Sequence, residues 1–548
     1  MINKQEQISS LLDEIRKNGY SNATKQFIKK NPNHGYRFNK KEGCVAFPTL
    51  NKNSSKCLII NSDLGNIPEF LSGIFDDIVS LDIHEKIQIQ KHRFEEKDIC
   101  NIRFIECKTG RLPITEKEFD LVVINGIKVE EEKSNEEIRF YLESVKELLN
   151  EQGCLCLGVK NKHGIQLFQE IIDDDIFLDD FKGYRSQLES LNFKIDAYWT
   201  VASHNQINFW GRMDDDISIK WFIQNFDKKF FVDKKFKMIG KILKMFTKSI
   251  RKNMMERFCP SFIFCCYKNS INTLEKTIYT KTGFNSSIQH NRPTKILYFL
   301  FDDNGKPMKV VTCKPTSYEL TEEIFQFIPK FPGLKILDEK LIIEDWVEGI
   351  PLNRLNEVEV KLVLNWLINF QIKTQNEILK MSEIDEEIKF LKIELELIKE
   401  ISDLPYHSWL EEFREEFVGK EIRKSAVHGD FNVRNLLIDH DKFRANIIDW
   451  DSRYQDSGNP VYDFVWFATA SMALSNNLEN EYSDMKSKTR QSVEMIANVM
   501  NEHLGAKFDF LKLQRFMLLR FLPIRNKIDN DGHLFYIDIL RVLAKIEK

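Results

Sequence analysis

The stretch VHGDFNVRN, residues 427–435, places a histidine, an aspartate and two asparagines beside an apolar run in the last quarter of the chain. Asp430 and Asn435 lie five positions apart, so their side chains can face one ligand from opposite sides of a tight turn. Fourteen residues after Asn435, the apolar strand ANIID ends on Asp449. This spacing predicts that two carboxylates and one amide meet at a single site.

These residue types suit phosphoryl transfer, in which a protein supplies charge and position more than covalent chemistry. Mg²⁺ prefers hard oxygen ligands together with substrate phosphates, and Asn435 and Asp449 would supply such ligands. Asp430 would then orient the substrate hydroxyl and accept its proton. The alternative is that the three are ordinary turn residues, which the order of the blocks around them disfavours.

Three blocks, HGDFNVRN, IIDWD and GNPVYDFVWF, resemble the aminoglycoside phosphotransferase and choline kinase family. That family usually has an HGD-x4-N loop, an I-D-[WF]-[DE] strand and a D-P-x-x-D-[LF] helix start. The resemblance implies that Asp430 is the catalytic aspartate, that Asn435 and Asp449 bind Mg²⁺, and that ATP is the phosphoryl donor. It also implies that Asp463 braces the catalytic loop and that His428 supports the geometry of the loop.

The expected nucleotide site draws on the β-rich segment that precedes this region. Lys314 in MKVVTCKPT lies on the strand where a kinase places its phosphate-binding lysine, and Glu322 or Glu323 in the following helix would pair with it. In many relatives that lysine falls two residues before the proline, where this chain has Cys313, so the register stays open. A surface lysine at a strand end is the alternative.

Two further segments are expected to contact the nucleotide. The loop YTKTGFNSSIQ, with Gly283, Ser286 and Ser287, is a candidate cover for the phosphates. The strand end LIIEDWVEG is the candidate hinge, where backbone groups from Glu344 to Val347 would meet the adenine.

Strands alternate with helices in the N-terminal part of the chain. The segments CLIINSDLGN, DDIVSLDIHEK, NIRFIECKTG, FDLVVINGI and CLCLGVKN each predict a strand, and IRFYLESVKELLNEQG predicts an amphipathic helix. Such an alternation predicts a parallel sheet with right-handed crossovers. We therefore expect a doubly wound, Rossmann-like α/β domain.

The same segments resemble a class I methyltransferase, which binds S-adenosylmethionine over the strand ends. The glycine-rich turn of that family aligns with Asn61 to Gly65, where the last glycine remains and Asn and Asp tolerate the left-handed backbone. The resemblance implies that Asp82 binds the ribose hydroxyls and that Glu106 lies near the adenine, while Lys108 takes the usual acidic position. A folded scaffold without the cofactor is the alternative.

The sequence pattern changes near residue 271. From there, expected antiparallel strands and the hairpin turn DDNGKP replace the alternation of strands and helices. We expect a multidomain protein, α/β in its first half and α+β in its second. Its segments are a helical extension at 1–55, the methyltransferase-like domain at 56–268, and the N-lobe and C-lobe of a bilobal protein-kinase-like fold at 269–354 and 355–548.

The composition suits a folded protein rather than a disordered chain, since 42% of its 548 residues are hydrophobic and 30% are charged. The formal net charge of -4 is close to neutral, so the chain as a whole lacks the positive charge that would indicate nucleic-acid binding. The cysteines include no CxxC pair, which favours reduced thiols in the cytoplasm. No apolar run approaches the roughly 18 residues that a membrane span needs.

The segment KKFKMIGKILKMFTKSIRKN, residues 234–253, predicts a basic amphipathic helix. Its apolar face comprises Phe236, Ile239, Leu243, Phe246 and Ile250. Such a helix could lie on an anionic membrane surface or bind an acidic polymer. The favoured alternative is a helix whose apolar face packs against the protein and whose basic face is solvated.

Together these features favour an ATP- and Mg²⁺-dependent kinase that acts on a hydroxyl of a small molecule or glycan. The combination resembles bifunctional methyltransferase-kinases that modify bacterial surface polysaccharides, in which both domains act on one substrate. Two alternatives stay open. Methylation is the main activity in one, and in the other the chain is a nucleotide-binding scaffold with a degenerate methyltransferase domain.

Overall fold

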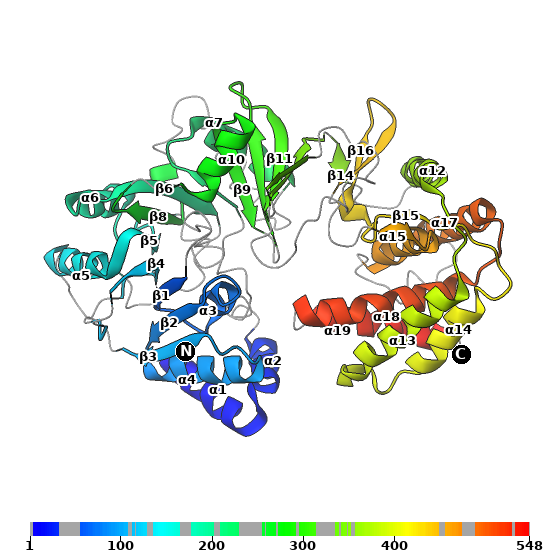
Figure 1. Ribbon diagram of the computed structural model, residues 1–548, viewed down its shortest axis with the longest axis horizontal. Coiled ribbons are helices and arrows are strands. Elements are labelled where there is room, and N and C mark those ends of the chain that lie inside the picture. Colours follow the sequence, from blue (N-terminus) through cyan, green and yellow to red (C-terminus); the bar gives the residue numbers. More distant parts are fainter. Residues whose placement is uncertain are drawn as a thin grey trace. The chain divides into compact units, whose positions relative to one another are not determined.

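The fold is described from a computed structural model, shown in Figure 1 with colours that run from blue to red along the chain. The described residues are 4–31, 55–107, 112–114, 117–128, 135–164, 177–201, 209–229, 255–257, 259–269, 272–291, 295–313, 335–338, 341–347, 349–351, 357–448, 455–473, 488–528 and 532–546. The chain divides into two compact units. The first comprises Met1–Leu320 and Lys330–Trp346, and the second comprises Thr321–Pro329 and Val347–Lys548.

One mixed sheet runs through the described part of the first unit, in the strand order β12-β13-β11-β10-β9-β7-β6-β8-β5-β4-β1-β2-β3. Its last five strands are mutually parallel. They are β1 (Lys56–Ile60), β2 (Asp77–Asp82), β3 (Ile102–Glu106), β4 (Phe119–Asn125) and β5 (Leu149–Lys160). Because β1 lies between β2 and β4, the strand order reverses there, as in a doubly wound sheet. The prediction of an α/β fold in this half is confirmed.

The central parallel strands are buried on both faces, which is why they have nearly continuous apolar sequences rather than alternating ones. In β4, the run Leu121–Ile124 is fully buried, and β1 is buried from Cys57 to Ile60. This apolar core holds the strand ends, where the polar side chains lie, in fixed positions.

The remaining strands of the sheet are antiparallel to their neighbours. They are β6 (Lys194–Val201), β7 (Phe209–Arg212), β8 (Ser261–Tyr267), β9 (Ser286–Asn291), β10 (Ile296–Phe301), β11 (Pro307–Cys313), β12 (Lys335–Asp338) and β13 (Leu341–Asp345). The predicted hairpin at DDNGKP is confirmed, since β10 and β11 pair across it and Gly305 takes a positive φ of 79°.

The main helices of the first unit connect and cover these strands. They are α1 (Lys4–Asn18), α2 (Tyr20–Lys30), α3 (Asn66–Leu71), α4 (His84–Glu96), α5 (Asn135–Leu148), α6 (Phe181–Ser190), α7 (Asp216–Lys229) and α10 (Leu274–Thr282). The two N-terminal helices α1 and α2 pack on α4, as the blue ribbons of Figure 1 show.

The second unit is mostly helical. Its helices are α12 (Glu357–Thr374), α13 (Met381–Glu396), η4 (Lys399–Ile401), α14 (Tyr406–Glu415), η5 (Val433–Asn435), α15 (Val461–Ala473), α17 (Lys488–Leu504), α18 (Phe510–Ile528) and α19 (Gly532–Ile546). Two small sheets lie among them. One pairs β14 (Ile350–Pro351), β16 (Leu436–Asp439) and β17 (Arg444–Ile447), and the other pairs β15 (Ser425–Val427) and β18 (Gln455–Gly458).

The predicted boundary between residues 268 and 269 falls between β8 and α10, within the first unit and within one sheet. The four predicted segments and the bilobal kinase-like fold stay predictions. The basic segment 234–253 lies outside the described residues. Within the described helices, none combines the length and the apolar character that crossing a membrane requires.

Candidate active site

The loop that follows β15 is held by a buried carboxylate on α15. Oδ2 of Asp463 accepts a hydrogen bond from the backbone N–H of His428 at 2.8 Å, and Oδ1 accepts one from Gly429 at 3.0 Å. Gly429 has a positive φ of 76°, which glycine adopts at little cost. Burial raises the pKa of Asp463, while the hydrogen bonds from the backbone N–H groups of His428 and Gly429 oppose that shift. Asp463 therefore fixes the backbone at the start of the loop.

The imidazole of His428 is 1% exposed and bonds to the backbone at both ring nitrogens. Nδ1 accepts a hydrogen bond from the backbone N–H of Asp430 at 3.2 Å, and Nε2 donates to the carbonyl oxygen of Ile448 at 3.1 Å. These two bonds assign the neutral tautomer with the proton on Nε2. His428 thus connects the loop after β15 to Ile448, which follows β17.

Two side chains orient the carboxylate of Asp430 through the same oxygen atom. Oδ1 accepts hydrogen bonds from Nδ2 of Asn432 at 2.9 Å and from Nε1 of Trp466 at 3.0 Å. Asp430 is half-buried. Two donors at one oxygen therefore fix the orientation of the Asp430 carboxylate.

The amide of Asn435 is oriented by the same loop. Its Nδ2 donates to the carbonyl oxygen of Asp430 at 2.9 Å, so Oδ1 is the atom that could bind a cation. The backbone N–H of Ile448 donates to the carbonyl oxygen of Asn435 at 2.9 Å, which extends the pairing of β16 with β17. Asp449, the second predicted Mg²⁺ ligand, lies outside the described residues.

The turn after β1 keeps the backbone that its sequence predicts. Asn61, Asp63 and Gly65 have φ values of 59°, 51° and 94°, so Asn and Asp take the left-handed conformation in place of glycine. Nδ2 of Asn61 donates to the carbonyl oxygen of Gly126 at 2.6 Å. This bond joins the ends of β1 and β4, the two strands between which the sheet order reverses.

Asp82 lies at the end of β2 with a side chain that is 0% exposed. Oδ2 accepts a hydrogen bond from the backbone N–H of Asp63 at 2.8 Å, and Oδ1 accepts one from Ile83 at 2.8 Å. Oδ1 also pairs with Nζ of Lys128 at 3.0 Å. Both carboxylate oxygens therefore already bind groups of the protein.

Glu106 ends β3 and has a half-exposed side chain. It accepts a hydrogen bond from Nε2 of Gln88 at 3.1 Å and lies 2.9 Å from Nδ1 of His84. The interaction with His84 lowers the pKa of Glu106. Lys108 lies outside the described residues.

Comparison with known protein families gives a match within the second unit. Residues 380–495 match the phosphotransferase enzyme family, APH. The match includes the loop after β15, Asp463 and Trp466. Residues 380–495 are therefore assigned to the APH phosphotransferase family, and a search of curated proteins finds no match.

The N-terminal half is similar, at low identity, to solved structures that include two methyltransferases. YcgJ from Bacillus subtilis is 11% identical, with coverage of 42% of this chain and 99% of YcgJ and a TM-score of 0.28. A TehB-like SAM-dependent methyltransferase from Corynebacterium glutamicum is 13% identical, with coverages of 45% and 97% and a TM-score of 0.25. Phosphoethanolamine N-methyltransferase 1 from Haemonchus contortus is 15% identical, with coverages of 33% and 45% and a TM-score of 0.25.

The predicted nucleotide residues of the phosphotransferase lie in different environments. Lys314, Glu322 and Glu323 lie outside the described residues. Gly283 is the left-handed C-cap of α10, with a φ of 77°. Ser286 is 4% exposed and donates its hydroxyl to the carboxylate of Asp215 at 2.8 Å. Its hydroxyl is thus engaged inside the first unit.

The predicted hinge lies where one compact unit ends and the other begins. Glu344 pairs with Val310 across β13 and β11, and the backbone N–H of Trp346 donates to the carbonyl oxygen of Met308 at 2.9 Å. Trp346 is the last residue of the first unit, and Val347 belongs to the second. Contact of these residues with adenine stays a prediction.

The two implied ligands differ in how well the described residues suit them. The phosphotransferase loop suits Mg²⁺-ATP, since it offers an oriented carboxylate at Asp430 and an oriented amide oxygen at Asn435. The strand ends of the first unit do not suit S-adenosylmethionine, because the side chain of Asp82 is fully buried and already bonded. Among the described residues, no cluster of three or more His, Cys, Asp or Glu side chains could hold a metal ion.

Sequence analysis missed the two residues that orient Asp430. Asn432 lies two positions after Asp430, within the quoted loop. Trp466 lies three positions after Asp463 on α15, so both side chains lie on the same face of that helix. This spacing is the signal that could have linked Trp466 to the site.

Proposed function

We propose that the C-terminal region transfers a phosphoryl group from Mg²⁺-ATP to a hydroxyl of a small molecule or glycan. The observation that supports this proposal best is the carboxylate of Asp430, which two donors hold at one oxygen beside the oriented amide of Asn435. The family match of residues 380–495 supplies the reaction class. The acceptor class follows from the resemblance to kinases of surface polysaccharides.

In this proposal each loop residue has a separate task. The carboxylate of Asp430 takes the proton from the acceptor hydroxyl as the hydroxyl oxygen attacks the γ-phosphorus of ATP. The bond between the γ-phosphorus and the bridging oxygen breaks, and ADP leaves. Oδ1 of Asn435 and the carboxylate of Asp449 would bind Mg²⁺, which lowers the charge that builds up on the phosphates. His428 and Asp463 keep the loop backbone in place.

The cellular role proposed for the protein is surface polysaccharide biosynthesis in the cytoplasm. The acceptor would be the terminal sugar of a glycan or a related small molecule that carries a free hydroxyl. This role rests on the domain combination alone and is independent of the loop geometry.

The test is mass spectrometry of products after the full chain is incubated with Mg²⁺-ATP and extract from the source cell. We expect an added phosphate on a hydroxyl-bearing compound, and Asp430→Asn should lower its rate of formation by at least ~10³-fold. Asp441→Asn, an exposed change on the turn between β16 and β17, is the matched control and should retain the rate. Full turnover by folded Asp430→Asn would contradict the assignment.

A further inference from the structure

We propose that the N-terminal α/β half works without S-adenosylmethionine, as a structural platform for the strands β9 to β13. Two independent sets of contacts carry this inference. One set closes the strand ends where an open α/β sheet binds its ligand. The other set joins the parallel part of the sheet to the strands that precede the phosphotransferase domain.

The first set begins at the point where the strand order reverses, between β1 and β4. Open α/β sheets bind ligands outside the carboxyl ends of the strands at such a point. Here the side chain of Asn61 crosses from β1 and donates to the carbonyl oxygen of Gly126, directly after β4, at 2.6 Å. An amide of the protein thus links the two strand ends at this point.

Charged side chains pair with one another beside this bond. Lys128 binds Asp82 at 3.0 Å, and Lys86 binds Asp63 at 2.9 Å. The Asp82 side chain is 0% exposed and that of Lys128 is 12% exposed. Because the Asp82 side chain has no exposed surface, ribose hydroxyls could reach it only if a covering group such as Lys128 moved away. A charge left buried without its partner is strongly disfavoured.

The inner side of the turn is also closed. Leu64 is 1% exposed and packs in one apolar cluster with Leu11 and Leu12 of α1. The carbonyl oxygens of Asp63 and Leu64 accept hydrogen bonds from side chains of α4, Gln90 at 2.7 Å and Arg93 at 2.8 Å. The turn therefore has its polar groups satisfied within the protein, and its apolar side chain lies under the N-terminal helices.

The second set of contacts makes β9 a continuation of the same sheet. β7 and β9 pair in antiparallel register, with Phe209 opposite His290 and Gly211 opposite Ile288. The rings of Phe209 and His290 stack across this pair, with centroids 4.1 Å apart. The predicted N-lobe strands are thus hydrogen-bonded to the α/β half.

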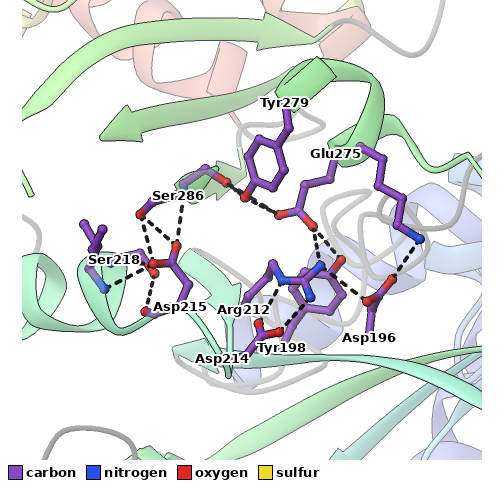
Figure 2. A network of polar contacts seen from close by, with 12 residues as sticks. Asp196, Tyr198, Arg212, Asp214, Asp215, Ser218, Glu275, Tyr279 and Ser286 are labelled. Atoms are coloured by element: carbon purple, nitrogen blue, oxygen red, sulfur yellow. Dashed lines mark hydrogen bonds and ion pairs between the residues drawn. The ribbon is translucent and has the colours of Figure 1, made fainter. Parts of the chain in front are cut away.

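An ionic network around the buried Glu275 reinforces this junction, and Figure 2 labels Glu275, Tyr198, Arg212 and Asp196 among its members. Glu275 on α10 is 1% exposed and accepts hydrogen bonds from Tyr198 of β6 and Gln289 of β9, both at 2.8 Å. Arg212 of β7 lies 3.5 Å from Glu275 and 3.3 Å from Asp196 of β6. Burial raises the pKa of Glu275, and the Arg212 guanidinium opposes that shift.

A second anchor lies beside this network. Asp215, at the start of α7, accepts hydrogen bonds from the Ser286 hydroxyl at 2.8 Å and from the backbone N–H of Ser287 at 3.1 Å. It also accepts from the backbone N–H of Ser218 at 3.1 Å, so one carboxylate caps α7 and holds the first residues of β9. Together the two anchors attach α10 and β9 to strands β6 and β7.

Calorimetric titration of the full chain with S-adenosylmethionine and S-adenosylhomocysteine tests the closed strand ends. We expect no saturable heat up to ~1 mM of either compound. Saturable binding with a Kd at or below ~100 μM would overturn this part of the proposal. The titration requires no phosphotransferase activity, so its outcome is separate from that of the proposed function.

A pair of variants on β2 tests whether Asp82 is a structural residue. Asp82→Asn should lower the thermal midpoint of the first unit by several degrees, because Lys128 loses its buried partner. Asp77→Asn is the matched control on the same strand, since Asp77 forms a half-exposed pair with Arg103, and its midpoint should stay unchanged. An unchanged midpoint for Asp82→Asn would contradict the structural role.

Hydrogen exchange of the full chain tests the platform. Arg212→Met should speed amide exchange at least ~10-fold in β9 and β10 as well as in β7, because the ionic network links β7 to β9 and β10 pairs with β9. Arg212→Lys, which keeps the charge, should have a smaller effect and serves if Arg212→Met fails to fold. Arg103→Met on the far strand β3 is the control and should leave β9 unchanged. Faster exchange in β7 with no change in β9 would overturn the platform.

Discussion

The indole N–H of Trp466 donates to Oδ1 of Asp430, with the two heavy atoms 3.0 Å apart. The indole is itself held by Phe521, whose ring stacks on it with centroids 3.7 Å apart and planes 16° apart. Phe521 of α18 thus holds Trp466 of α15 in place. Trp466 in turn orients Asp430, the proposed proton acceptor. The orientation of Asp430 therefore depends on helix packing in the second unit as well as on its own loop.

Trp466→Phe should keep the aromatic stack on Phe521 and remove the hydrogen bond to Asp430. We expect kcat to fall about tenfold, because the carboxylate loses part of its fixed orientation, while the KM for ATP changes little. Steady-state kinetics of the full chain with its phosphoryl acceptor measures both constants. An unchanged kcat would show that the bond does not position Asp430.

Asn432 and Trp466 donate to the same oxygen, so their effects on the rate should not add. We expect a double-mutant cycle of Asn432→Ala and Trp466→Phe to give a coupling free energy of about 0.5–3 kcal/mol. The measurement is kcat for the two single variants, the double variant and the unchanged protein. Additive effects within error would mean that the two donors act on Asp430 independently.

Asn435→Ala should raise the Mg²⁺ concentration needed for half-maximal activity by about tenfold or more, because the amide oxygen is a proposed ligand of that ion. Removal of Mg²⁺ with a chelator should abolish transfer in every variant. Asn432→Ala is the matched control, since it loosens the loop without removing a ligand. Asn432→Ala should lower kcat but leave the Mg²⁺ concentration for half-maximal activity unchanged. If Asn432→Ala raised that concentration as much as Asn435→Ala does, the proposed role of Asn435 as a ligand would be refuted.

His503 links α17 to α12 through a 3.1 Å contact between its Nε2 and Oε1 of Gln371. Burial lowers the pKa of His503 below its ordinary value of 6.5. The unfolded chain therefore binds more protons than the folded chain just below pH 6.5, so the free energy of unfolding should fall as the pH decreases through that window. Below the pKa of His503 in the folded protein, this contribution to the pH dependence of the free energy of unfolding should end.

His503→Gln removes the titrating group and should flatten this part of the pH dependence. Urea unfolding of the second unit, followed by near-ultraviolet circular dichroism at several values between pH 5 and 7.5, measures the slope. Because exposed His407 has no contact with Gln371 among the described contacts, His407→Gln should leave the slope intact. Equal slopes for His503→Gln and the unchanged protein would contradict the prediction.

Local sequence patterns predicted the strands and turns whose conformation depends on residues close together in the chain. The strands of the α/β half follow from their apolar runs, and the left-handed backbone at Asn61 and Asp63 follows from the residue types. The spacing of Asp430 and Asn435 likewise depends on a short loop, and the structure brings them together through the bond between Nδ2 of Asn435 and the Asp430 carbonyl. The catalytic roles of these residues stay predictions.

Long-range pairings were not visible in the sequence. Lys128 follows Asp82 by 46 residues, so nothing local indicates that the strand-end carboxylate would be neutralised by a lysine. The pairing of β7 with β9 joins residues about 80 positions apart and depends on which strand edges remain open once the sheet has formed. Trp466 was missed for a related reason, because an apolar helix with one indole suggests packing before it suggests a hydrogen bond.

The continuous sheet has a consequence for shortened forms of the protein. A chain that began at α10 would lack β7, and the backbone N–H and C=O groups of Ile288 to His290 would lose the strand that pairs with them. The unpaired N–H and C=O groups of an exposed strand edge can pair with further chains to form intermolecular sheets. Self-association during expression, rather than a low intrinsic rate, is therefore the expected defect of an isolated C-terminal fragment.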